Sequence, residues 1–253
     1  MFSIEKSDYI NWVIPLSMLV AVVIVLRHQI DSWYVRKSKP QMDSTLHAIL
    51  KRKVFGYDEM FVGSHYNKTD HLAFNHDCDF IGQGLESIPD DLQHMVTAHA
   101  FFFGKETHRK WPSHYNRIVL YKHPFLSPRF DEDVHSVEHH HEDGVFIFSL
   151  EQGIPGIERP KHHYNIFLHG FADAFFTLYP VHHHYDEAAI FEKLEEAVGV
   201  TEDHLISVIG LDEINPLAVL AHYYVYRPEV ISEAFPEFRD SVFANMNVPK
   251  VMT

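Results

Sequence analysis

The chain has little cysteine and little positive charge. Cys78 is the single cysteine among 253 residues, so the fold cannot depend on an internal disulfide, as is usual in a reducing compartment. Lysine and arginine number 21 against 35 acidic residues, which gives a formal net charge of −14. No basic stripe follows the first 40 residues, and we therefore predict that the protein does not bind nucleic acid.

Motifs for covalent catalysis are also missing. The chain contains no Gly-x-Ser-x-Gly sequence, and Cys78 has only generic neighbours, so neither a serine nor a cysteine nucleophile is supported. Internal repeats and low-complexity linkers are absent after residue 45. Apolar residues make up 46% of the chain, enough for a sizeable buried core. We predict that residues 45–253 form one domain.

One long apolar run, YINWVIPLSMLVAVVIVL, extends from Tyr9 to Leu26 without a charge. As a helix it would span about 27 Å, close to the hydrocarbon core of a bilayer. Acidic residues precede the run and basic residues follow it, which is unlike a secretory signal peptide. We predict a transmembrane anchor over 1–29 and a juxtamembrane linker over 30–44; the alternative is a buried core helix. The positive-inside rule places the N-terminus outside the cell (inner) membrane and the main domain in the cytoplasm.

Hydrophobic periodicity and turn residues predict an α+β, helix-rich domain. Helices are expected where apolar residues recur at helical spacing and where Pro, Gly or acidic residues mark the ends. Strands are expected in two runs of β-branched and aromatic residues. The predicted helices cover 44–57, 88–104, 165–176, 186–199 and 215–226, with a short terminal helix from Pro236, and the predicted strands cover 116–125 and 144–150.

Histidine is abundant, with 22 residues, and it occurs in two runs at 139–141 and 182–184. Neighbouring residues of an extended chain point in opposite directions, so a run of histidines rarely supplies two ligands to one metal ion. We interpret most of these histidines, with His162 and His163, as solvated loop residues.

Three segments resemble, in the same order and at matching spacing, the MtfA family of zinc peptidases, whose catalytic region is similar to that of anthrax lethal factor. They are MVTAHAFFFG with YNRIVLYKHPFLS, then GVFIFSLEQGIPGIERPKHHYNIFLHGFADAF, then LAVLAHYYVYRPEVISEAFPEFRDSVF. Together they cover roughly residues 90–245. The resemblance implies a zincin-like domain behind the predicted anchor.

The resemblance also implies the position of an active site. The family carries His-Glu-x-x-His on a helix, with two zinc ligands and a general base, and a third ligand, a glutamate, on a later helix. Here the first histidine corresponds to His169, the base to Gly170, the second histidine to Asp173 and the third ligand to Asn215. Three of the four chemical groups are therefore changed, and we predict no catalytic residues.

The changed positions leave alternatives open. Asp173 can ligate zinc through oxygen, or it can accept a hydrogen bond from His169 inside an apolar helix without any metal. Asn215 precedes Pro216, which is typical of a helix N-cap. A shift of the alignment by two or three residues would make Glu213 or Asp212 the substitute acid. His222 would lie about 10.5 Å further along the helix than Asn215, too far to replace it.

We therefore expect a catalytically inactive peptidase homologue, a pseudoenzyme, held in the membrane through residues 9–26. It would act as a regulatory or accessory subunit bound to a protein partner in a membrane assembly, with no cofactor. The alternative is an active zinc metallopeptidase with a rearranged metal site at His169, Asp173 and Glu213. A third possibility is a histidine-rich metal buffer or sensor at the membrane.

Overall fold

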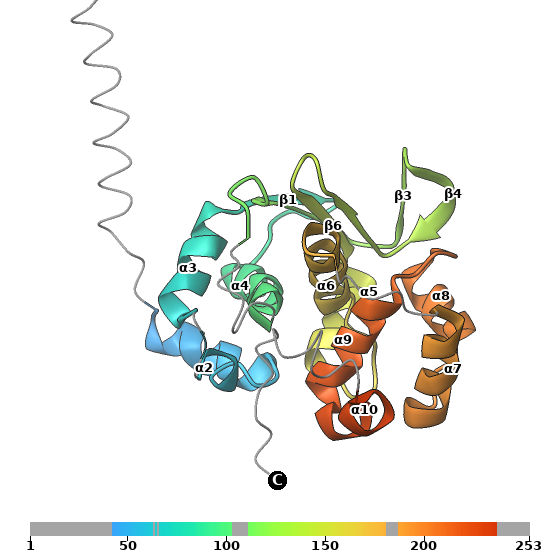
Figure 1. The fold of residues 1–253 in the computed structure, drawn as a ribbon. Helices are drawn as coiled ribbons and strands as arrows, with labels where there is room; N and C mark the ends of the chain where they lie inside the picture. Colours follow the sequence, from blue (N-terminus) through green and yellow to red (C-terminus); the bar gives the residue numbers. More distant parts are fainter. Residues whose placement is uncertain (1–41, 63, 65, 103–110, 181–186, 237–253) are drawn as a thin grey trace, which may run out of the picture. The chain divides into compact units, whose positions relative to one another are not determined.

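A computed structural model describes residues 42–62, 64, 66–102, 111–180 and 187–236 (Figure 1). They belong to one compact unit, Met42–Thr253. Among these residues no helix combines the length and the apolar character that crossing a bilayer requires. The predicted anchor, the predicted linker up to residue 41, the second histidine run and nearly all of the predicted terminal helix lie outside the described residues.

The largest sheet has four strands in the order β1-β2-β6-β5. Strands β1 (Asp79–Gln83), β2 (Arg117–Tyr121) and β6 (Val145–Ser149) are parallel, and β5 (Val137–His140) is antiparallel to β6 at the edge. A turn ending at Gly144, with φ of +63°, joins β5 to β6, and a side chain there would collide with the backbone of the segment before β2. Glycine is the residue that fits this turn.

Strands β3 (Phe125–Ser127) and β4 (Phe130–His135) form a separate antiparallel ribbon. The chain runs from β4 through Ser136 directly into β5. The ribbon therefore stands beside the edge of the main sheet, as Figure 1 shows.

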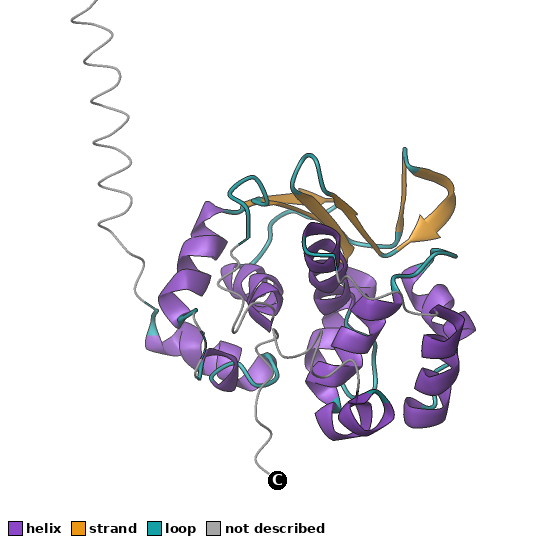
Figure 2. Ribbon diagram, in the orientation of Figure 1, coloured by secondary structure: helices purple, strands orange, loops and turns teal. Residues whose placement is uncertain are grey.

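Helices make up most of the remaining chain and lie on one side of the strands (Figure 2). The sequence places an apolar side chain at alternate positions of β2 and β6, and these side chains are buried on the side that the helices cover. The helical elements are α2 (Ser44–Lys53), η1 (Glu59–Phe61), α3 (Lys68–Asp77), α4 (Asp90–Ala98), η2 (His99–Phe102), α5 (Leu150–Glu158), α6 (Ile166–Leu178), α7 (Glu187–Val198), α8 (Glu202–Ile209), α9 (Pro216–Tyr226) and α10 (Pro228–Ala234).

Helix α6 is central because nearly all its faces are apolar. Asn165 caps it by accepting hydrogen bonds from the backbone N–H groups of Phe167 and Leu168. Its aromatic side chains pack on those of β6: the ring centroids of Phe146 and Phe171 are 4.5 Å apart, and those of Phe148 and Phe167 are 5.0 Å apart. This interface fixes the depth and orientation of α6 beneath the sheet.

The mixed α and β fold, richer in helix, is confirmed, and so are the predicted helices that became α2, α4, α6, α7 and α9 and the strands β2 and β6. The predicted helix over 215–226 ends before Pro228, but a further helix that was not predicted, α10, begins at that proline, which occupies its first helical turn. The predictions did not include α3, α5, α8 or the other four strands.

Candidate functional site

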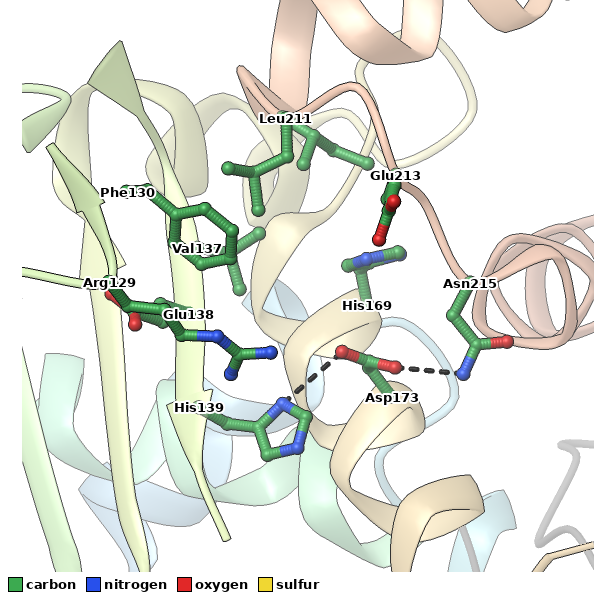
Figure 3. A pocket seen from close by; sticks show the side chains of 11 residues that line it. Arg129, Phe130, Val137, Glu138, His139, His169, Asp173, Leu211, Glu213 and Asn215 are labelled. Atoms are coloured by element: carbon green, nitrogen blue, oxygen red, sulfur yellow. Dashed lines mark hydrogen bonds and ion pairs between the residues drawn. The ribbon is translucent and has the colours of Figure 1, made fainter. Parts of the chain in front are cut away.

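A cavity of about 140 Å³ lies where the edge strand β5, helix α6, the ribbon and the loop before α9 meet (Figure 3). Its polar lining includes the residues that the sequence analysis marked as possible metal ligands, except Asp212. The polar residues are Arg129, His139, His169, Asp173, Glu213 and Asn215, with Glu138 at the edge strand. We call this space the pocket.

His169 is buried in α6, with 5% of its surface exposed. Its Nδ1 lies 2.7 Å from the hydroxyl of Tyr164. Burial raises the pKa of Tyr164 well above its ordinary value, so the phenol is neutral and its O–H donates to Nδ1. Burial also lowers the pKa of His169 to about 4, against the opposing influence of Asp173, so the ring is neutral at pH 7. In this tautomer Nε2 carries the proton and is a hydrogen-bond donor.

Asp173, one helical turn after His169, has both carboxylate oxygens engaged. Oδ1 accepts a hydrogen bond of 2.8 Å from Nδ2 of Asn215, and Oδ2 lies 3.2 Å from Nδ1 of His139. Burial raises the pKa of Asp173, but the hydrogen bonds from His139 and Asn215 and the nearby His169 outweigh it, and the pKa lies below its ordinary value. The carboxylate is therefore ionised at neutral pH.

These contacts correct two expectations. The predicted hydrogen bond from His169 to Asp173 is replaced, because His169 is engaged by Tyr164 and Asp173 by residues from two other elements. The interpretation of the first histidine run as solvated loop is wrong for His139, whose side chain is only 11% exposed. It holds for His141, His162 and His163, which are exposed.

Strand geometry explains how His139 reaches Asp173. Val137 and His139 share the face of β5 that packs on α6, while Glu138 and His140 share the opposite face. The two neighbouring histidines thus point to different environments, as expected for an extended chain. The sequence did contain a signal for this contact, because His139 lies two residues after the apolar Val137 and would share its face in a strand. β5 is too short, however, to be recognised as a strand from its pattern.

Asn215 serves two purposes. Its Oδ1 accepts a hydrogen bond of 3.0 Å from the backbone N–H of Leu217, so it caps α9 as predicted. The same side chain donates through Nδ2 to Asp173. Asn215, which the sequence resemblance aligns with the third zinc ligand, therefore links α9 to α6 by a hydrogen bond.

Gly170 faces the sheet. A Cβ atom at this position would lie 2.6 Å from Cε1 of Phe148 and 2.8 Å from Cγ2 of Val137. Real atoms cannot approach so closely, so α6 packs on β5 and β6 at this depth because residue 170 has no side chain. A glutamate at 170 would have to displace the sheet side chains.

Glu138 and His135 form a closed pair beside the pocket, which sequence reasoning missed. Both side chains are almost completely buried. Nδ1 of His135 lies 2.8 Å from the carbonyl oxygen of Asp133, so this nitrogen carries a proton, and Nε2 lies 3.2 Å from Oε2 of Glu138. Burial raises the pKa of Glu138, but hydrogen bonds from His135 and Ser127 and the nearby imidazoles outweigh it and lower the pKa overall. The Glu138 carboxylate therefore has hydrogen-bond partners of its own within this pair and its surroundings.

His222 lies away from the pocket, as the helical spacing predicted. Its Nε2 accepts a hydrogen bond of 3.0 Å from the backbone N–H of Asn165. The side-chain amide of Asn165 in turn lies 2.9 Å from Nε2 of His99 and from the hydroxyl of Tyr226. This buried network holds the start of α6 against α9.

The residues that the sequence resemblance aligns with the zinc-site positions fit a zinc ion poorly. His169 is the single imidazole that remains, its Nε2 is protonated in the favoured tautomer, and both oxygens of Asp173 are engaged. Glu213, the possible substitute, is exposed in the loop before α9. Within the described part of the chain, no three or more His, Cys, Asp or Glu side chains are arranged to hold a metal ion.

Comparison with known proteins adds no further constraint. No family model, curated protein or solved structure matches the chain, and the resemblance to the MtfA family therefore remains a prediction from sequence.

Proposed function

We propose that residues 45–253 form a zincin-like, MtfA-like domain that has lost peptidase chemistry and acts by binding. Held in the cell membrane by residues 9–26, with the domain in the cytoplasm, it would be a regulatory or accessory subunit of a membrane assembly. The observation that carries this proposal is the environment of Asp173. Its carboxylate occupies the family's second ligand position and is held on both oxygens by His139 and Asn215.

Two further contacts support the loss of chemistry. A water bound near His169 would need a general base, and Gly170 offers none because its position faces Phe148 and Val137. The third-ligand position is occupied by Asn215, which caps α9. The groups that would activate a peptide bond in the family hold α6, α9 and β5 together in this chain.

The pocket itself supports a binding role. It combines a cavity with a mixed polar and apolar lining, which is typical of ligand sites. We infer that the pocket is used for recognition.

The rival proposal is an active zinc metallopeptidase with a rearranged site. It is favoured by one observation: His169, Asp173 and Glu213 all line the same pocket. Asp173 would have to leave at least one of its two partners to join a metal, and His169 would have to change tautomer.

Zinc content distinguishes the proposals. The untagged full-length protein, purified in detergent micelles and dialysed, is expected to hold well under one equivalent of tightly bound zinc by elemental analysis. It should also show no chelator-sensitive peptidase activity. One tight zinc that is lost in His169→Ala, and retained in the exposed-loop control His162→Ala, would establish the rival. Several weakly held ions would instead favour the metal buffer.

Topology is tested separately. Reporter fusions at both ends should place Met1 outside and Thr253 in the cytoplasm, because the basic residues follow the apolar run. An exported C-terminus would contradict the proposed membrane arrangement.

A further inference from the structure

Two opposite charges face each other across the pocket. Arg129 lies in the turn between β3 and β4, and its guanidinium carbon lies 5.0 Å from the ring centroid of Phe130. Figure 3 shows this guanidinium directed into the pocket from the ribbon and the carboxylate of Glu213 directed inward from the loop before α9. In the described structure neither group has an ion-pair partner.

The two other carboxylates that line the pocket already have hydrogen-bond partners. Asp173 is bound by His139 and Asn215, and Glu138 is bound by His135. Arg129 and Glu213 therefore differ from the other charged side chains that line the pocket in having no ion-pair partner among the described residues, and a ligand with one negative and one positive group would supply a partner to each.

The remaining walls are apolar and the space is small. They are formed by Phe130, Val137, Ile209 and Leu211. A cavity of about 140 Å³ has room for about five water molecules, so it suits a compact ligand and excludes a folded segment. The guanidinium of Arg129 lies within cation–π distance of the Phe130 ring, and a guanidinium can contact a planar carboxylate through two N–H groups.

We propose that this pocket binds a small aliphatic amino acid as its zwitterion. Arg129 would hold the carboxylate, Glu213 would hold the ammonium group, and the side chain would lie on the apolar walls. Nε2–H of His169 is available as a further donor. A simple anion would give Glu213 no oppositely charged partner, and a simple amine would give Arg129 none. A zwitterion supplies a partner to both residues. This inference rests on the proposed function, because a metal at His169 would occupy the same space.

The test uses full-length protein in detergent micelles and isothermal titration with glycine, L-alanine, L-valine and L-leucine. At least one of the four should bind saturably at one per chain. The N-acetyl and carboxamide derivatives of that amino acid, which each lack one charge, should bind at least about tenfold more weakly. Equal binding of either derivative would overturn the proposal.

Variants then assign the two charges. Arg129→Gln and Glu213→Gln should each weaken binding at least about tenfold, while the exposed controls Arg52→Gln and Glu202→Gln should not change it. Melting temperatures of the four variants should match the wild type, because all four positions are exposed. Wild-type affinity in Arg129→Gln would overturn the inference.

Failure of this inference is distinguishable from failure of the proposed function. If none of the four amino acids binds and the protein also lacks tight zinc, the ligand assignment is wrong and the non-catalytic proposal stands. If the protein holds one tight zinc at His169, the proposed function itself is wrong.

Discussion

Two clusters of hydrogen-bonded polar side chains in this protein differ in whether they contain a carboxylate and line a cavity. The closed cluster, between α3 and α4, consists of Tyr57, His71, Asn75, His94 and Thr97. The hydroxyl of Tyr57 lies 2.7 Å from Nδ1 of His71, Nε2 of His71 lies 3.0 Å from Oγ1 of Thr97, and Thr97 donates to Asn75 over 2.9 Å. The pocket cluster consists of His139, His169, Asp173 and Asn215.

The closed cluster contains no carboxylate and His71 is completely buried, so burial lowers the pKa of His71 to about 3 and its ring stays neutral. The pocket cluster contains an ionised carboxylate and lines a cavity. Both clusters are rich in histidine, so abundance of histidine does not itself indicate a metal site. The carboxylate and the cavity mark the cluster that can bind a ligand.

The largest expected effect comes from forcing the pocket cluster toward the family's motif. Gly170→Glu should lower the free energy of unfolding by about 4 kcal/mol or more, because it combines a steric clash with Phe148 and Val137 and the burial of a charge. Denaturant unfolding measures this effect. Thr177→Glu, at an exposed position of the same helix, is the control and should change stability by less than about 0.5 kcal/mol. Wild-type stability of Gly170→Glu would mean that α6 does not contact the sheet at this point.

Breaking the closed cluster should have the next largest effect. His71→Ala removes a buried ring and the partner of the Tyr57 hydroxyl, and should cost about 3 kcal/mol at pH 7. The folded-state pKa of His71 is about 3, below the ordinary 6.5. The stability that the neutral His71 ring contributes is therefore complete above pH 6.5 and is lost as the pH falls toward 3. The stability difference between the two proteins should therefore narrow below pH 6.5, while binding of a ligand in the pocket stays unchanged.

Breaking the pocket cluster should lower the free energy of unfolding by less, and the pH range in which this effect appears should also differ. Asp173→Ala leaves His139 and Asn215 without their acceptor and should lower the free energy of unfolding by about 2 kcal/mol. The folded-state pKa lies below the ordinary 3.8, so this contribution is present above about pH 4 and is lost as the pH falls further. Denaturant unfolding at pH 7 and near pH 3 measures the difference. A value near zero at pH 7 would show that the carboxylate is solvated.

The smallest effect should separate the two roles of Asn215. Asn215→Ser keeps an N-cap oxygen for Leu217 but loses the donor to Asp173, and should cost about 1 kcal/mol or less. Asn215→Ala loses both interactions and should cost about 1 kcal/mol more than the serine variant. Equal stability of the two variants would assign the whole effect to the hydrogen bond with Asp173.

The sequence predicted those elements that carry long and regular patterns. The apolar periodicity gave α6 and α9, and the Asn-Pro pair gave the start of α9, because capping depends on neighbouring residues. The edge strand β5 was not predicted, since three of the four residues Val137–His140 are polar and resemble a loop. The contact of His139 with Asp173 could not be found either, because it joins two elements that only the folded sheet brings together.

The position of β5 also has a consequence for the order of folding. β5 and β6 are joined by a tight turn, so their pairing closes a short loop, and hairpins of this kind form in about 1–10 μs. The parallel pairs β1–β2 and β2–β6 must close loops that contain whole elements, and such non-local pairings form more slowly. We expect His139 to be set on its hairpin before α6 docks and delivers Asp173. The wall of the pocket that β5 forms would then be in place early in folding, and Asp173 would join it later, when α6 packs on the sheet.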